Sequence, residues 1–218
     1  MNLRTNGRYP VLMTRKSWDE TLTALAVIYL AAFSYPAFVD PVPPDLHKAL
    51  EAIQWFVYGV FAIDFAVGLS LSKDRKQYLK SHPLEVLSVA LPVLRPLRLL
   101  RLITIGSLVI QRVAVGRQFA ILVKVFLFSI LVSYIAAVQL TIVERPIEGS
   151  NIKSFGDGLW WALTTVTTVG YGDKFPTTSE GRAIAFGLML VGISLMGVIT
   201  ASVAAWFVKM SQNEKYSD

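Results

Sequence analysis

The stretch WWALTTVTTVGYGDKFPTT, residues 160–178, decides the architecture of this chain. Within it, Gly170 and Gly172 alternate with Val169 and Tyr171. Glycine adopts positive φ values that other residues avoid, so alternate glycines allow a strand to aim successive carbonyl groups to one side. Four such strands around one axis would form stacked rings of oxygen atoms, which can replace the hydration shell of a cation.

The composition of the whole chain indicates a membrane protein. Of its 218 residues, 54% are hydrophobic and 17% are charged, against about 25% charged residues in a typical soluble domain. This composition argues against a soluble enzyme, a disordered protein and a nucleic-acid binder, although the net charge is +6. The chain contains no cysteine, which excludes disulfides, thiolate nucleophiles and cysteine metal sites. We therefore expect no enzymatic activity.

Six apolar segments are candidates for crossing a bilayer, which takes roughly 20 helical residues. They are expected at residues 17–39, 46–71, 77–91 (short for a span), 92–111, 118–143 and 179–210. The stretch 154–176 lies between the last two and is too short to cross, with a short helix expected over 155–166. Irregular backbone at membrane depth is tolerated only where protein buries it or where it lines a water-filled cavity. We therefore expect a re-entrant loop here.

The placement of lysine and arginine predicts the orientation. Thirteen of these residues fall on the side that holds both termini, and five fall on the other side. An excess of positive charge marks the cytoplasmic side, so both termini are expected in the cytoplasm. The first span is longer than the apolar region of a signal peptide and no A-x-A site follows it, which argues against cleavage.

The loop carries a specific resemblance. Its core is the TVGYG sequence of potassium-channel selectivity filters, formed here by Thr168, Val169, Gly170, Tyr171 and Gly172. With paired tryptophans before it and an aspartate after it, the region 17–210 resembles a prokaryotic six-transmembrane voltage-gated potassium channel. A loop rich in glycine and threonine would by itself indicate only a turn, but this one lies between two full spans.

The resemblance implies an all-α membrane protein, with a four-helix voltage-sensor bundle and a two-helix pore domain that carries a re-entrant pore helix and the selectivity filter. The implied parts are a cytoplasmic N-terminal segment (1–16), the voltage sensor (17–111), a sensor–pore linker (112–118), the pore domain (119–210) and a cytoplasmic tail (211–218). One filter strand per chain requires four copies for a closed ring, so we expect a homotetramer. The expected location is the cell membrane, with anionic lipid as a partner and no nucleic acid.

The resemblance also assigns roles at the filter. The carbonyl groups of Thr168, Val169, Gly170 and Tyr171 would coordinate dehydrated K⁺, which is the permeant ion and not a cofactor. Trp160 and Trp161 would surround the filter together with Tyr171, and Asp173 would accept a hydrogen bond from Trp160. Phe175 follows at the outer mouth, where four aromatic rings could bind external tetraethylammonium by cation–π attraction.

Arg95, Arg98 and Arg101 recur at every third position among leucines. Arginine within a bilayer is costly and is usually paired or hydrated. The resemblance makes these arginines voltage-sensing charges and implies that they pass a charge-transfer centre formed by Phe61, Asp64 and Glu85. The alternative is a static bundle in which the arginines only pair with the two acids.

Gly192 lies 20 residues after Gly172, where related channels carry a gating hinge. Glycine lowers the cost of bending a helix, but small residues also serve close helix packing in membranes. Both roles stay open for Gly192.

Three functions remain in order of preference. The first is a voltage-gated potassium channel, in which movement of the arginine-bearing helix opens a tetrameric pore. The second is a potassium channel with a vestigial sensor. The third is a potassium-uptake transporter subunit, which ranks low because such proteins usually carry four degenerate filters in one chain and this chain has a single intact one.

Overall fold

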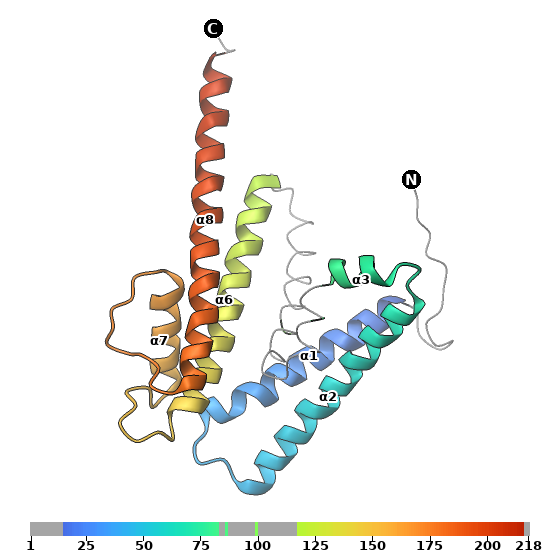
Figure 1. Cartoon of the computed structure of the whole chain (residues 1–218), viewed down its shortest axis with the longest axis vertical. Coiled ribbons are helices and arrows are strands. Elements are labelled where there is room, and N and C mark those ends of the chain that lie inside the picture. Colours follow the sequence, from blue (N-terminus) through green and yellow to red (C-terminus); the bar gives the residue numbers. More distant parts are fainter. Residues whose placement is uncertain (1–14, 83–85, 87–98, 100–116, 216–218) are drawn as a thin grey trace.

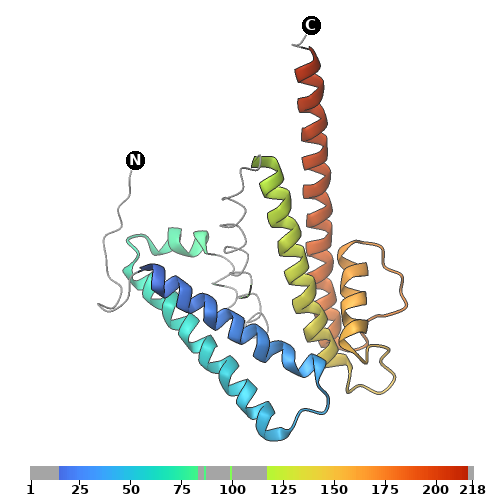
Figure 2. The same cartoon turned by 180° about the vertical axis from the view of Figure 1, so that it is seen from behind.

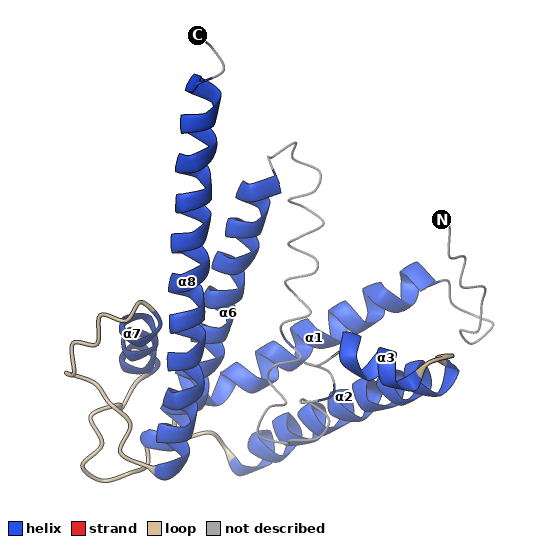
Figure 3. Cartoon of the chain, turned by 45° about the horizontal axis from the view of Figure 1, so that its top comes forward, coloured by secondary structure: helices blue, strands red, loops and turns tan. Residues whose placement is uncertain are grey.

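The computed structural model describes residues 15–82, 86, 99 and 117–215, and every regular element in these ranges is a helix (Figure 3). The described helices are α1 (Arg15–Phe38), α2 (Pro44–Leu71), α3 (Arg75–Ser81), α6 (Arg117–Glu144), α7 (Phe155–Val166) and α8 (Ser179–Lys215). They form two groups: α1 and α2 lie as an inclined pair, while α6 and α8 run side by side with α7 beside them (Figures 1 and 2).

Four helices of the described part are long and apolar enough to cross a membrane. They comprise Glu20–Phe38, Pro44–Leu71, Leu122–Glu144 and Ser179–Val208. These correspond to the predicted first, second, fifth and sixth spans. About half of the predicted third span and all but one residue of the predicted fourth span lie outside the described residues, so the four-helix sensor bundle stays a prediction.

The start of the predicted third span is wrong in one respect. Residues 77–81 belong to the separate helix α3, which ends at Ser81, and His82 is its C-cap with φ −125° and ψ 51°. The residue after His82 is Pro83, and a proline disfavours helical geometry in the residue that precedes it. A continuous helix therefore does not run through this point.

A shared core joins the first helix to α6. Tyr29, Phe33 and Ala37 of α1 are buried together with Val57, Leu99, Ile135 and Val138. The Tyr134 hydroxyl donates to Ser34 Oγ at 2.8 Å, and the ring of Phe38 lies 4.4 Å from that of Phe155 at the start of α7. The α1–α2 pair is thus packed directly against the part of the chain that carries the loop.

The second core lies between α6, α7 and α8. Its buried members are Ala136, Ala137, Leu140, Ile152, Trp161, Ala162, Val166, Ala185 and Leu188. Helix α7 spans the predicted range 155–166, and it begins with a capping box in which Ser154 and Asp157 bind each other's backbone N–H groups. Such a box satisfies two N–H groups that a helix start otherwise leaves unpaired. The core and the box together fix the short helix from which the filter sequence emerges.

Candidate functional site

The backbone of the filter sequence has positive φ at every second residue. The values are 62° at Thr168, 57° at Gly170 and 77° at Gly172. Two of these are the alternate glycines that the sequence singled out for this freedom. Thr168 has a conformation that is unusual for a β-branched residue.

The amide groups of this segment are bound to the end of α7. Thr168 N donates to Thr165 O at 3.0 Å, while Val169 N and Gly170 N both donate to Thr164 O, at 2.9 and 3.0 Å. In a trans peptide the carbonyl of one residue points opposite to the N–H of the next, and the bonds in this segment are trans. The carbonyls of residues 167–169 are therefore directed away from the last turn of α7, with a common orientation suited to cation coordination.

The two tryptophans lie in different surroundings. The ring of Trp160 stacks on that of Tyr171, with centroids 5.5 Å apart and planes 11° apart. Trp160 Nε1 also donates to Asp173 Oδ2 at 2.8 Å, which is the predicted hydrogen bond. Trp161 is instead buried in the core between the three helices, so among the described residues Trp160 is the tryptophan that stacks on Tyr171.

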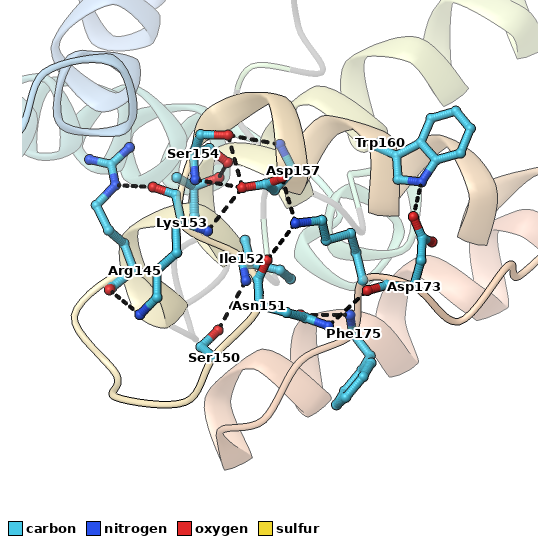
Figure 4. A network of polar contacts seen from close by, with 12 residues as sticks. Arg145, Ser150, Asn151, Ile152, Lys153, Ser154, Asp157, Trp160, Asp173 and Phe175 are labelled. Atoms are coloured by element: carbon cyan, nitrogen blue, oxygen red, sulfur yellow. Dashed lines mark hydrogen bonds and ion pairs between the residues drawn. The ribbon is translucent and has the colours of Figure 1, made fainter.

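Asp157 binds on both of its carboxylate oxygens. Oδ2 accepts from Lys153 N, Ser154 N and Ser154 Oγ, whereas Oδ1 lies 2.7 Å from Lys174 Nζ. Partial burial raises the pKa of Asp157, but the hydrogen bonds from Lys174 and from the backbone of Lys153 and Ser154 outweigh it and lower the pKa from 3.8 to about 2. The carboxylate is thus charged at neutral pH and joins the start of α7 to the residues after the filter (Figure 4).

Glu144 is a structural residue that the sequence reasoning missed. It is fully buried at the end of α6, and its carboxylate accepts from the backbone N–H groups of Thr177 and Thr178, each at 2.9 Å, and from both of their hydroxyls. These four bonds fasten the chain just before α8 to the end of α6. In the sequence, the role of Glu144 was indicated only by its position, as an acidic residue directly after an apolar span.

Gly192 lies where α8 approaches the C-terminal end of α7. A Cβ atom at this position would be 2.8 Å from the carbonyl oxygen of Val166 and 3.2 Å from its Cα. Close packing of α8 against the end of α7 therefore explains why this position is a glycine. The hinge remains a prediction.

The predicted sensor residues are placed only in part. Phe61 and Asp64 lie on α2, and Asp64 Oδ1 accepts from Trp18 Nε1 of α1 at 2.8 Å, a partner that the sequence did not indicate. Glu85, Arg95, Arg98 and Arg101 lie outside the described residues. Leu99, which falls between two of the arginines in sequence, is fully buried in the core shared by α1, α2 and α6.

Comparison with known proteins finds a similarity to ion channels over part of the chain. Residues 120–209 match the Ion_trans_2 family, described as "Ion channel". This segment contains α7, the filter sequence and nearly all of the two flanking helices. This part of the chain is accordingly similar to ion channels.

The particular relatives are potassium channels. A voltage-gated potassium channel of Aeropyrum pernix is 45% identical over 78 residues, which are 36% of this chain and 26% of that protein. The calcium-gated potassium channel TvoK of Thermoplasma volcanium is 37% identical over 89 residues, 41% of this chain and 26% of its own length. The human potassium voltage-gated channel subfamily KQT member 4 is 33% identical over 93 residues, 43% of this chain and 13% of that protein. The matches cover about a quarter of the length of the two prokaryotic relatives.

Proposed function

We propose that the chain is the subunit of a homotetrameric channel of the cell membrane that conducts K⁺ selectively and passively. The observation that carries the proposal is the filter backbone, whose amides are bound to α7 and whose carbonyls at Thr168 and Val169 point the other way. Carbonyl rings from four subunits would replace the hydration shell of K⁺. Val169 and Tyr171 are 57% and 67% exposed in a single chain, and assembly around a common axis would cover such residues. The names of the relatives support the same ion.

The test is conduction by the purified chain in a planar bilayer with K⁺ and Na⁺ on opposite sides. The reversal potential is expected to follow the K⁺ gradient, and light scattering in detergent is expected to give four copies of the 24.1 kDa chain. A monomer, or equal permeation of Na⁺ and K⁺, would contradict the proposal.

Two glycine variants separate the filter geometry from general effects. Gly170 and Gly187 both have open space where a Cβ would be, but only Gly170 has a positive φ, +57°. Gly170→Ala is therefore expected to abolish or strongly reduce K⁺ conduction. Gly187→Ala, in the helix α8, is expected to conduct like the unmodified chain.

Voltage gating is the finer part of the proposal. One relative is named as voltage-gated and another as calcium-gated, so the relatives' names support voltage gating only in part. Arg95, Arg98 and Arg101 would carry the sensing charge past the charge-transfer centre of Phe61, Asp64 and Glu85. One charge moved through 100 mV is worth about 2.3 kcal/mol, so three arginines in each of four subunits could bias a gate strongly.

Neutralisation of two arginines tests the sensor. The double variant Arg98→Gln, Arg101→Gln is expected to shift the conductance–voltage curve and reduce its slope. An unchanged curve with intact K⁺ selectivity would leave a potassium channel whose sensor is vestigial.

The proposed orientation has both termini in the cytoplasm and places α3 at the cytoplasmic surface. Four exposed cations lie on or just before this helix: Lys73, Arg75, Lys76 and Lys80. Basic residues beside a membrane attract anionic lipid with about 1 kcal/mol each. Replacing all four by glutamine is expected to weaken the preference of the reconstituted protein for phosphatidylserine over phosphatidylcholine, measured by native mass spectrometry.

A further inference from the structure

The three residues that follow the filter are tied to the loop before α7 (Figure 4). Asn151 Nδ2 donates to Asp173 O at 2.8 Å, Phe175 N donates to Asn151 Oδ1 at 3.2 Å, and Lys174 Nζ donates to Asn151 O at 2.7 Å. Lys174 Nζ also forms the ion pair with Asp157 Oδ1 at 2.7 Å. One asparagine therefore binds all three residues in turn, and one lysine joins them to α7.

Asn151, Lys174 and Asp157 form what we call the exit clamp. The clamp holds Asp173, the residue whose carboxylate binds Trp160 beside the filter. Asp173 is held at two points, by its carboxylate on Trp160 and by its carbonyl on Asn151. Trp160 also stacks on Tyr171, which lies two residues before Asp173 in the sequence. A shift of the Asp173 backbone would therefore disturb both the Trp160 bond and the filter segment that ends at Gly172.

The clamp is largely shielded from water. The side chains of Lys174 and Asp157 are 28% and 24% exposed. Hydrogen bonds that involve an ionised group are shorter and stronger than neutral ones. The Lys174 ammonium makes two such bonds, one to Asn151 O in the loop and one to Asp157 Oδ1 of α7.

We propose that Asn151 and the Lys174–Asp157 pair are positioning residues that hold the outer end of the filter in its conducting conformation. This inference rests on the proposed function, because it concerns how long an existing potassium filter stays conductive. The residues act through Asp173 and do not touch the ion. Loss of the clamp shortens the conducting periods, and K⁺ bound in the filter opposes that loss.

The loop offers a matched control. Lys153 is also a lysine of this region, and its Nζ donates to Arg145 O at 3.0 Å and to Ile147 O at 2.6 Å. Its side chain thus makes two bonds within the loop, and neither of these joins the loop to residues 173–175. Lys153→Met removes as many ammonium hydrogen bonds as Lys174→Met without releasing the exit segment.

The test uses single-channel recordings of the full chain in planar bilayers at low and high external K⁺. Lys174→Met and Asn151→Asp, which keeps the acceptor for Phe175 N but removes the donor to Asp173 O, are expected to shorten conducting bursts at least about fivefold at low K⁺. High K⁺ is expected to restore most of the burst length. Lys153→Met is expected to behave like the unmodified chain.

The pair itself is tested by a double-mutant cycle. Asp157→Asn keeps one acceptor oxygen for the start of α7, and its effect is expected to add little to that of Lys174→Met if both act through the same ion pair. Fully additive effects would overturn the assignment of the pair.

Two further outcomes would overturn the inference. One is burst lengths in Lys174→Met and Asn151→Asp equal to those of Lys153→Met. The other is loss of the tetramer in both variants while Lys153→Met stays assembled, because the clamp would then serve assembly and not the filter. Failure of the unmodified chain to select K⁺ would instead contradict the proposed function itself.

Discussion

At the residue scale, Gly192 shows how a single missing methyl group allows two elements to meet. The approach of 2.8 Å to the Val166 carbonyl is too close for a Cβ, so any side chain must push α8 away from the end of α7. Because the filter begins two residues after Val166, such a shift would reach the filter. Packing and hinge bending, the two roles left open by the sequence, therefore make different predictions.

Gly192→Ala is expected to destabilise the fold by about 1–3 kcal/mol, the usual cost of inserting a carbon into a filled space. The measurement is the melting temperature of the purified protein in detergent. Gly197→Ala is the control, because nothing lies within 4 Å of a Cβ there, and it is expected to be neutral or slightly stabilising. An unchanged melting temperature with altered gating would instead favour the hinge.

Phe175 carries the second prediction at this scale. Its ring is 51% exposed, while its backbone N–H is held by Asn151. A fixed backbone with a free ring suits cation–π binding of a quaternary ammonium. Phe175→Val is expected to reduce block by external tetraethylammonium about tenfold, measured as the concentration for half-block of K⁺ current. Block that is unchanged in the variant would exclude this ring as the binding site.

Thr168 marks the limit of prediction at the residue scale. The motif predicts unusual backbone freedom at Gly170 and Gly172, and both have positive φ. The same geometry at Thr168 could not be predicted from its residue type, since a β-branched side chain disfavours it by roughly 1–3 kcal/mol. Its cause is non-local: the amides of Thr168 and the two following residues are bound to carbonyls at the end of α7.

At the element scale, the start of α7 depends on one carboxylate. Asp157 caps the helix through one oxygen and binds Lys174 through the other. A negative charge in the first turn is also favourable to the helix dipole. The protonation state of Asp157 therefore links the stability of α7 to pH.

The sign of this linkage follows from the lowered pKa. Since the pKa falls from 3.8 to about 2 on folding, the stabilisation is fully present above pH 3.8 and is lost as the pH falls toward 2. The full shift corresponds to at most about 2.5 kcal/mol. Melting temperatures measured from pH 5 to 2 are expected to fall less steeply in Asp157→Asn than in the unmodified chain. Parallel curves would show that Asp157 does not contribute.

The elements themselves were predicted unequally. Apolar length located α1, α2, α6 and α8 to within a few residues, and the short helix expected over 155–166 coincides with α7. The end of α3 at Ser81 was missed, because hydropathy does not register that Pro83 disfavours helical geometry at His82. The contacts of Asn151 and Lys174 were not predictable either. They join the segment between α6 and α7 to residues 173–175, and these two stretches are more than 20 residues apart in the sequence.

At the scale of the whole molecule, Arg145 joins the end of α1 to the loop between α6 and α7. Its Nη1 donates to Pro36 O at 2.9 Å, its Nη2 donates to Ala37 O, and its Nε donates to Lys153 O at 3.1 Å. The carbonyl groups at the end of α1 lack helical partners, and a cation there is also favoured by the helix dipole. Arg145 therefore fastens the end of α1 to the end of α6.

This fastening matters for a moving sensor. The core of Tyr29, Phe33, Ile135 and Val138 already packs α1 on α6, and Arg145 adds charged hydrogen bonds at the outer end. A segment that moves relative to the pore needs a stationary neighbour on which its displacement can act. In the proposed channel, α1 would supply that stationary neighbour, and the arginine-bearing segment would move against it.

Arg145→Met is expected to release the last turn of α1, because the carbonyl groups of Pro36 and Ala37 lose their donor at once. A charged hydrogen bond contributes about 1.5–3 kcal/mol, so amide exchange in the last turn of α1 and at residues 39–40 is expected to rise at least tenfold. Hydrogen–deuterium exchange with mass spectrometry measures this change. Arg182→Met, at an exposed arginine of α8, is the control and is expected to leave α1 unchanged. Equal protection of α1 in the two variants would show that the shared apolar core holds the helix without Arg145, and any coupling between sensor and pore at this end would then depend on packing alone.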